Sequence, residues 1–261
     1  MSDTGLHVLT LEAEDLSVEI SARRLVERLN FTINPGTFLA VLGENGVGKT
    51  LTMHTLAGLR APGAGTIRLR GEDLTTWPRH ELARVLGLLT QSSEDPFPST
   101  VLETALIGRH PHIEFWRWES ERDLGIARGA LAAVGLAALE GRSLETLSGG
   151  ERRRLAIATV LTQDPALYLL DEPTNHLDPH HQLEILRLFR TRVDQGRTVI
   201  ASLHDATLAS RFADQVLLLY GDGTWTFGPT VVVLDAAHLT RLYHTAIHEL
   251  DFRGRRIFVS D

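Results

Sequence analysis

The run GENGVGKT at 43–50 is the feature that most restricts how this chain can fold. It fits the pattern GxxxxGK[ST], in which glycines let successive backbone N–H groups turn toward one bound anion. An apolar segment, Thr37–Leu42, precedes the run, and a stretch with helical character from about Lys49 to Leu59 follows it. A phosphate loop needs this strand–loop–helix setting, because the helix N-terminus adds its dipole to the backbone donors. The sequence therefore predicts an α/β fold around a triphosphate-binding loop.

Lysine occurs once in the chain, at position 49, among 26 basic residues. A compact ammonium group fits under a bent phosphate chain, where a planar guanidinium is too wide. We expect Lys49 to contact the β- and γ-phosphates of ATP and the Thr50 hydroxyl to bind Mg²⁺. A plain glycine-rich turn is the alternative interpretation. The residues predicted to hold the nucleotide here are Gly43, Glu44, Asn45, Gly46, Val47, Gly48, Lys49 and Thr50.

Short apolar segments elsewhere predict further strands. They lie at 85–90, 166–170, 198–202 and 215–220, the last paired with 224–227 across a Gly-Asp-Gly turn. Helix-like segments separate most of them, which favours a mainly parallel sheet. The segments 6–20, 29–33 and 66–70 alternate apolar and polar residues, as half-buried strands do. From about 92 to 141 the chain is rich in Ala, Leu and Arg and poor in β-branched residues, so we expect a helical insertion there.

Two adjacent acids, Asp171 and Glu172, end the apolar strand predicted at 166–170. A buried strand presents such side chains with little freedom. Phosphoryl transfer depends mainly on positioning and charge neutralisation. We therefore expect Asp171 to bind the metal and Glu172 to face the attacking water. A strand-ending turn before Pro173 is the alternative interpretation.

The segment Leu147-Ser-Gly-Gly-Glu151 has two compatible interpretations. Ser148 followed three residues later by Glu151 is a capping box that starts a helix. A bare Gly-Gly helix N-terminus is also shaped to receive a phosphate from another molecule. The neighbouring run Arg152-Arg153-Arg154 is interpreted as a solvated helix face.

These motifs follow one another in the order phosphate loop, Gln91, LSGGE, LYLLDEP, NHLD and His204. In order and spacing the chain resembles the ATP-binding cassette (ABC) family over essentially its whole length. The resemblance implies one α/β domain, 1–261, with a P-loop NTPase core and a mainly parallel sheet at 37–91 and 160–261. It also implies an N-terminal antiparallel β subdomain at 1–36 and 60–75, and an inserted α-helical subdomain at 92–159 that carries the signature motif.

The resemblance also implies roles for single residues. Two copies would form a head-to-tail dimer, each ATP lying between one Lys49 loop and the partner's Ser148, Gly149 and Gly150. Gln91 would sense metal and water, Glu172 would be the general base, and His204 would hold the γ-phosphate. Asp178 would contact the opposite subunit. Ile20 stands where the family usually has an aromatic side chain that stacks on adenine, and Glu151 where it often has Gln.

A metal site is an alternative interpretation of one histidine-rich segment. His176, Asp178, His180 and His181 lie close together in the sequence. Histidine and carboxylate side chains are metal ligands. The same segment is accounted for by the NHLD loop and by a helix that starts at Pro179.

Composition narrows the possible partners. A formal net charge of −7 gives no indication of nucleic-acid binding. The sequence has no cysteine, which excludes disulfides and fits the cytosol. No apolar run approaches the roughly 20 residues that span a bilayer. Any membrane role must therefore come through a partner, and the family resemblance implies a place on the cytoplasmic face of the inner membrane, held by permease subunits.

The groove beside the insertion would receive the permease, with Ser92–Trp118 forming much of it. Its aromatic residues suit an interface, although packing inside the insertion is an equal alternative. They are Phe97, Phe115, Trp116 and Trp118. The runs ALIGRHPH and Val231–Leu250 resemble importers of ferric siderophores, haem and cobalamin, which work with a periplasmic or lipid-anchored binding protein. Other ABC transporters, or a soluble cassette ATPase such as one for iron–sulfur cluster assembly, remain alternatives.

Overall fold

The structure is a computed structural model that describes residues 9–21, 23–91, 98–114 and 116–261. A six-stranded sheet forms the centre, in the order β10-β9-β3-β8-β7-β6. Its strands are β3 (Phe38–Leu42), β6 (Leu86–Leu89), β7 (Leu167–Leu170), β8 (Thr198–Ser202), β9 (Gln215–Leu219) and β10 (Trp225–Pro229). All neighbouring pairs are parallel except β9 and β10. Every residue of β3, β7 and β8 is buried, as expected for parallel strands covered on both faces.

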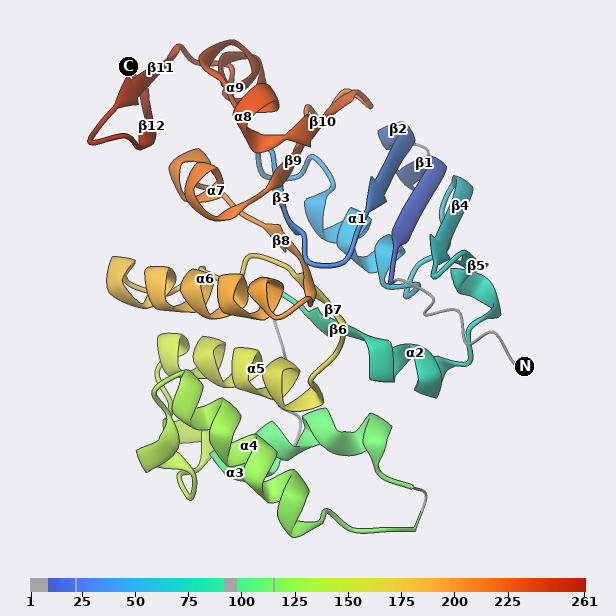
Figure 1. Cartoon of the computed structure of the whole chain (residues 1–261), viewed down its shortest axis with the longest axis vertical. Coiled ribbons are helices and arrows are strands. Elements are labelled where there is room, and N and C mark those ends of the chain that lie inside the picture. Colours follow the sequence, from blue (N-terminus) through green and yellow to red (C-terminus); the bar gives the residue numbers. More distant parts are fainter. Residues whose placement is uncertain (1–8, 22, 92–97, 115) are drawn as a thin grey trace.

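A second, antiparallel sheet packs beside the first in the order β2-β1-β4-β5. Its strands are β1 (Leu11–Ile20), β2 (Arg23–Ile33), β4 (Ala64–Leu69) and β5 (Glu72–Asp73). Helix α1 (Lys49–Leu56) lies between the two sheets, and its Met53 and Leu56 are fully buried in their shared core. This sheet lies on the right-hand side of the molecule in Figure 1. The predicted mainly parallel sheet with an antiparallel β subdomain is confirmed.

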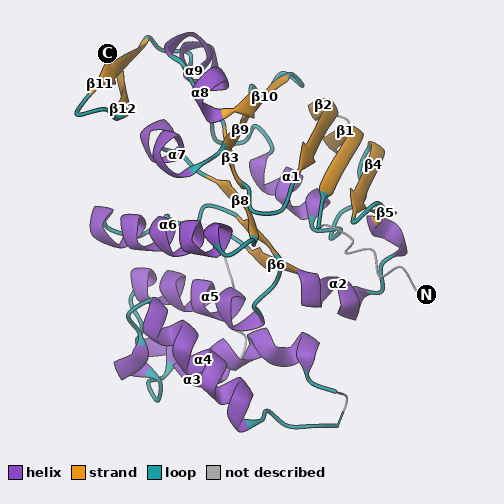
Figure 2. Ribbon diagram, in the orientation of Figure 1, coloured by secondary structure: helices purple, strands orange, loops and turns teal. Residues whose placement is uncertain are grey.

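Helices make up the lower end of the molecule in Figure 2. They are α3 (Val101–Leu106), η2 (Ile107–His112), α4 (Glu121–Ala133), η3 (Ala137–Leu139), η4 (Leu144–Thr146) and α5 (Gly149–Gln163). Helix α5 packs against α3, α4 and η2 on one side and against β6 on the other. Its buried residues Leu155, Ile157 and Leu161 join the large core beneath the parallel sheet. Helix α5 therefore belongs to both the helical part and the sheet core.

The remaining elements surround the parallel sheet. They are η1 (Leu74–Thr76), α2 (Arg79–Val85), α6 (Pro179–Asp194), α7 (Ala206–Phe212), α8 (Thr230–Val233), α9 (Ala236–Tyr243), β11 (Ile247–Asp251) and β12 (Arg256–Ser260). The tail that starts at Val231 thus forms two short helices followed by a β-hairpin, which packs on α7. No helix in the described ranges has the length and apolar character needed to cross a bilayer.

Candidate functional site

The phosphate loop joins β3 to α1 in a conformation that requires glycine. Gly48 is the residue before α1 and has a φ of 109°, in the left-handed region that disfavours side chains. A Cβ at this position would lie 3.0 Å from the Cβ of Leu25. A Cβ at Gly43 would lie 2.7 Å from the carbonyl oxygen of Leu219. Larger residues at either position would therefore displace the loop from the strands that hold it.

Lys49 is buried at the start of α1, and its ammonium group turns back onto the loop. Its Nζ donates hydrogen bonds to the carbonyl oxygens of Gly43, at 2.7 Å, and Glu44, at 3.0 Å. Burial lowers the pKa of Lys49, and the charges of Glu172 and Asp171 act in the opposite direction. The loop thus holds a positive charge in the place where a phosphate chain is expected.

Asp171 follows β7 and is fully buried. One carboxylate oxygen, Oδ1, accepts a hydrogen bond of 2.7 Å from the Ser202 hydroxyl, which in turn accepts one of 2.8 Å from the Glu172 N–H. The other oxygen, Oδ2, is buried and has no hydrogen-bond partner among the described residues. A buried carboxylate oxygen left unpaired is costly unless another group binds it. The Oδ2 atom therefore fits as a ligand of Mg²⁺, which prefers oxygen ligands.

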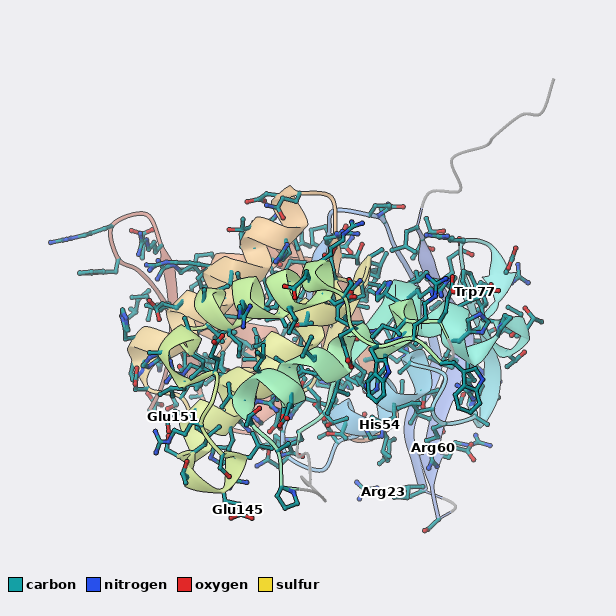
Figure 3. The ribbon with its side chains drawn as sticks, turned by 90° about the horizontal axis from the view of Figure 1, so that it is seen from below. Arg23, His54, Arg60, Trp77, Glu145 and Glu151 are labelled. Atoms are coloured by element: carbon teal, nitrogen blue, oxygen red, sulfur yellow. The ribbon has the colours of Figure 1, made fainter. Side chains whose placement is uncertain are left out.

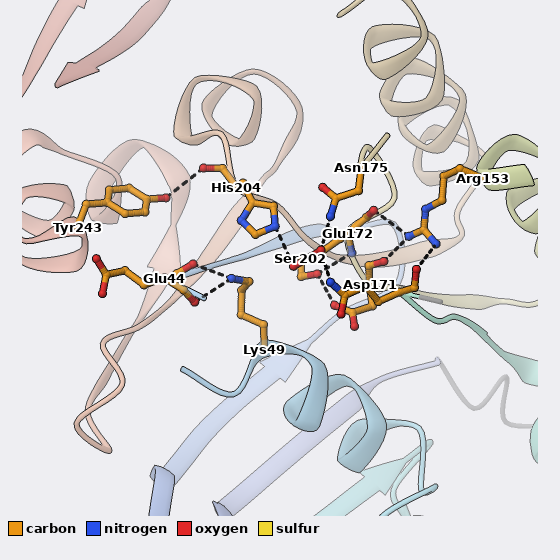
Figure 4. Close-up of polar contacts among 11 residues, drawn as sticks. Glu44, Lys49, Arg153, Asp171, Glu172, Asn175, Ser202, His204 and Tyr243 are labelled. Carbon is orange, nitrogen blue, oxygen red and sulfur yellow. Dashed lines mark hydrogen bonds and ion pairs between the residues drawn. The ribbon is translucent and has the colours of Figure 1, made fainter. Parts of the chain in front are cut away.

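Glu172 is also buried, and three side chains bond its carboxylate (Figure 4). Gln91 Nε2 donates to Oε2 at 2.9 Å, and Asn175 Nδ2 donates to the same oxygen. His204 Nε2 lies 2.8 Å from Oε1. The carboxylate is therefore fixed in orientation by residues from three separate loops.

These side chains line one cavity of about 580 Å³ next to the phosphate loop. It is lined by Ile20, Leu25, Asn45, Gly46, Gly48, Lys49, Thr50, Leu51, Gln91, Glu172, Asn175 and His204. Ile20 is 44% exposed at the end of β1 and forms part of an apolar edge with Leu25. The cavity thus combines a cationic phosphate loop, an acidic side and an apolar edge that suits a flat base.

The signature residues Ser148, Gly149 and Gly150 lie at the start of α5. The capping box is formed: Ser148 Oγ accepts from the Glu151 N–H at 3.3 Å, and Glu151 Oε2 accepts from the Ser148 N–H at 2.8 Å. The hydrogen bonds from Ser148 lower the pKa of Glu151. Within the described ranges, none of the three signature residues lines the cavity that holds Lys49. Figure 3 likewise places Glu151 on the helical part of the molecule, away from Arg23 of β2.

Asp178 begins helix α6 rather than lining the cavity. Its carboxylate accepts hydrogen bonds from the His181 N–H at 3.0 Å and from His181 Nδ1 at 2.7 Å. These bonds lower its pKa. Across the part of the chain that is described, no group of three or more His, Asp or Glu side chains is arranged to hold a metal ion. The metal interpretation of His176, Asp178, His180 and His181 therefore has no support.

The predicted permease groove is described only in part. Residues 92–97, including Phe97, and residue 115, which is Phe, lie outside the described ranges. Trp116 and Trp118 are each 90% exposed. These two tryptophans are therefore not buried in the helical part, and their role in an interface stays a prediction.

Sequence reasoning missed three residues that support the acids. Ser202 bonds Asp171 but does not stand out from its strand in the sequence. Asn175 bonds Glu172 and begins the NHLD motif, but the motif alone assigns it no such contact. For Arg153 the interpretation as a solvated helix face is wrong, because its side chain is 6% exposed and turns into the protein. Its position four residues before Ile157, on the same face of the helix, was the available signal.

Comparison with known proteins agrees with this geometry. Residues 26–175 match the family model described as ABC transporter. The hemin import ATP-binding protein HmuV of Nocardia farcinica is 39% identical over 248 residues, covering 93% of this chain and 85% of that protein. The ferric enterobactin transport ATP-binding protein FepC of Escherichia coli is 36% identical over 238 residues, covering 90% and 88%.

A solved structure extends the similarity to three dimensions. It is described as a metal-chelate type ABC transporter in an inward-facing conformation. It superposes with a TM-score of 0.84 at 30% sequence identity, covering 97% of this chain and 98% of that one. The similarity therefore includes the phosphate loop, the helical part and the C-terminal tail.

Proposed function

The chain belongs to the ABC transporter family of ATP-binding proteins, and from that premise we propose that it is the ATP-hydrolysing subunit of an importer for a metal chelate. The observation that carries the proposal is the convergence of Lys49, Gln91, Glu172 and His204 on one cavity. A triphosphate needs a cation and a row of backbone donors, and hydrolysis needs a base beside the terminal phosphate. The cavity brings these groups together.

Each residue has a distinct role in this proposal. Lys49 and the loop N–H groups bind the β- and γ-phosphates. Glu172 accepts the proton of the attacking water, and Gln91 and His204 hold water and γ-phosphate in place for it. Thr50 and Asp171 would hold Mg²⁺, with Gln91 beside them. A magnesium ion in such a site neutralises charge on the phosphates.

We propose that the working unit is a dimer of nucleotide-binding subunits. The signature residues Ser148, Gly149 and Gly150 do not line the described cavity of their own chain, and Ser148 and Gly149 are exposed at the N-terminus of α5, which favours anions. A second copy placed head to tail would bring them over the phosphates. Asp178, which is exposed at the start of α6, would contact that partner.

The relatives support a place at the cytoplasmic face of a membrane. HmuV and FepC are named as ATP-binding proteins of hemin import and ferric enterobactin transport, and each is covered over most of its length. The chain would bind permease subunits through the helical part, where Trp116 and Trp118 expose large aromatic surfaces suited to an interface. A periplasmic or lipid-anchored binding protein would deliver a cargo such as a ferric siderophore, haem or cobalamin.

Two experiments test the proposal. Purified wild-type protein should release phosphate from ATP only with Mg²⁺ present. Lys49→Ala should lose nucleotide binding and turnover while its thermal unfolding in buffer stays close to wild type. Undiminished turnover in Lys49→Ala would refute the site. Purification of the intact membrane complex should yield two permease subunits, and partners without membrane-spanning segments would refute the importer assignment.

A further inference from the structure

The side chain of Arg153 connects helix α5 to the backbone that carries the acids (Figure 4). Nη1 donates to the carbonyl oxygen of Thr90 at 2.7 Å and to that of Gln91 at 3.4 Å. Nη2 donates to the carbonyl oxygen of Glu172 at 2.8 Å and to that of Asp171. One guanidinium group thus contacts the ends of two strands, β6 and β7, at the point where each passes into the site.

This arrangement buries a positive charge without pairing it to a carboxylate. None of the ion pairs found among the described residues involves Arg153. Burial lowers the pKa of Arg153, while the charges of Asp171 and Glu172 raise it. A buried charge is costly unless its hydrogen bonds are strong and well placed. Here four backbone carbonyl groups accept hydrogen bonds from the guanidinium and offset the cost of burying its charge. They belong to the proposed site residues Gln91, Asp171 and Glu172 and to Thr90, which precedes Gln91.

The position of Arg153 on α5 and the rigidity of its guanidinium link movement of the helix to the backbone of the acids. Arg153 lies in the second turn of the helix whose first turn is Ser148–Glu151, and its side chain reaches the backbone carbonyl groups of both acids. The guanidinium is planar and rigid, so it fixes the distance between the helix and several carbonyl groups at once. Rotation of α5 against the sheet must therefore break these bonds or move the backbone of Asp171 and Glu172 with the helix.

We propose that Arg153 is a positioning residue for ATP hydrolysis, tying the signature helix to the backbone of Gln91, Asp171 and Glu172. This proposal rests on the function proposed above. Arg153 is not among the residues that line the cavity with Lys49; it sets where the two carboxylates stand. Movement of the signature helix when it meets the partner's nucleotide would be transmitted through this side chain to the subunit's own base.

Arg109 provides a matched comparison. It is also a buried arginine, 9% exposed, and its Nη1 donates 3.0 Å to the carbonyl oxygen of Thr162 on the same helix α5. Its Nε bonds Asp123 at 2.8 Å. All of these contacts stay within the helical part and α5. Loss of Arg109 should therefore cost stability without disturbing the acids.

The test compares Arg153→Gln and Arg153→Lys with Arg109→Gln. For Arg153→Gln we expect kcat to fall about 10- to 100-fold, the range for a misplaced catalytic group, while Kd for ATP, measured without Mg²⁺, changes by less than about threefold. Arg153→Lys keeps the charge and some donors, so its kcat should lie between those of Arg153→Gln and wild type. Arg109→Gln should lower the melting temperature while kcat stays within about twofold, at a temperature where all variants are folded.

The outcomes separate this proposal from the proposed function. A kcat within twofold of wild type in both Arg153 variants, or an equal fall in Arg109→Gln, would overturn the positioning role. A parallel loss of ATP affinity and kcat would also overturn it, because that pattern indicates general damage to the site. If Arg153→Gln does not fold, Arg153→Lys decides by the same criteria. Absence of Mg²⁺-dependent turnover in the wild-type protein would instead remove the proposed function.

Discussion

His204 Nε2 lies 2.8 Å from Oε1 of Glu172, so one oxygen of the proposed base is held by the histidine proposed to bind the γ-phosphate. Gln91 and Asn175 bond the other oxygen of the same carboxylate. A nucleotide whose γ-phosphate takes a hydrogen bond from His204 would release Oε1 for water. In the proposed mechanism, nucleotide binding would therefore expose the base.

Replacing the base should separate binding from hydrolysis. Glu172→Gln keeps the shape of the side chain and removes the proton acceptor, so we expect turnover to fall about 10²- to 10⁴-fold. ATP affinity should change little, because Lys49 and the loop supply the phosphate contacts. Phosphate release and equilibrium binding of ATP check the two expectations. Turnover close to wild type in this variant would show that another group accepts the proton.

An aromatic residue at position 20 should strengthen the contact with the adenine ring of ATP. Ile20 offers an exposed apolar side chain at the edge of the cavity, where a ring can stack on adenine. Aromatic stacking adds about 0.5–1.5 kcal/mol, which corresponds to roughly two- to tenfold in affinity. Ile20→Trp should therefore tighten ATP binding measured by calorimetry. Inorganic triphosphate is the control, since it has no base, and an equal gain for it would place the effect elsewhere.

Most of the proposed site could be predicted because its residues occur in short motifs. Lys49 and Thr50 follow a glycine loop, and Asp171 and Glu172 end an apolar strand, so local sequence placed each group. The buried strands were also evident, since short apolar runs between helices indicate a parallel sheet. The confirmed fold follows from these local patterns.

The groups that hold the acids could not be predicted in the same way. Ser202 meets Asp171 because β8 lies beside β7 in the sheet, a register that the sequence does not state. Arg153 looked solvated because it is one of three consecutive arginines, and only the packing of α5 against β6 decides which of the three turns inward. Such contacts depend on tertiary structure, so residue type and spacing alone do not identify them; for Arg153, helical spacing from an apolar residue was the one indication.

A large cation in the signature should prevent dimer closure. We expect Glu172→Gln protein to form a dimer with ATP, and Ser148→Arg in that background to stay monomeric, because the new side chain fills the space meant for the partner's nucleotide. Light scattering with and without ATP measures both. Ser120→Arg is a matched control: Ser120 caps α4 with the same capping-box geometry, so it loses a similar helix cap, about 1 kcal/mol, outside the signature. An ATP-dependent dimer in the Ser148→Arg variant would contradict the composite site.

Asp123 should make the stability of the helical part depend on pH. Hydrogen bonds from Ser120, then from Arg109, lower the pKa of Asp123 from 3.8 to about 2. Because the folded pKa lies below the unfolded one, the ionised carboxylate stabilises the fold above about pH 4, and this contribution is lost as the pH falls from 4 toward 2.

Asp123→Asn tests this dependence. It should lower the free energy of unfolding at pH 7 by about 1.5–3 kcal/mol, the usual value of hydrogen bonds to a charged group. The difference from wild type should shrink as the pH falls from 4 to 2, because the wild-type carboxyl becomes neutral over that range. Urea unfolding at several pH values measures it, with Glu145→Gln, a change at an exposed carboxylate of the same part, as the control for loss of one charge. A difference between Asp123→Asn and wild type that stays constant from pH 7 to pH 2 would show that the carboxylate charge contributes nothing and that only the shape of the side chain matters.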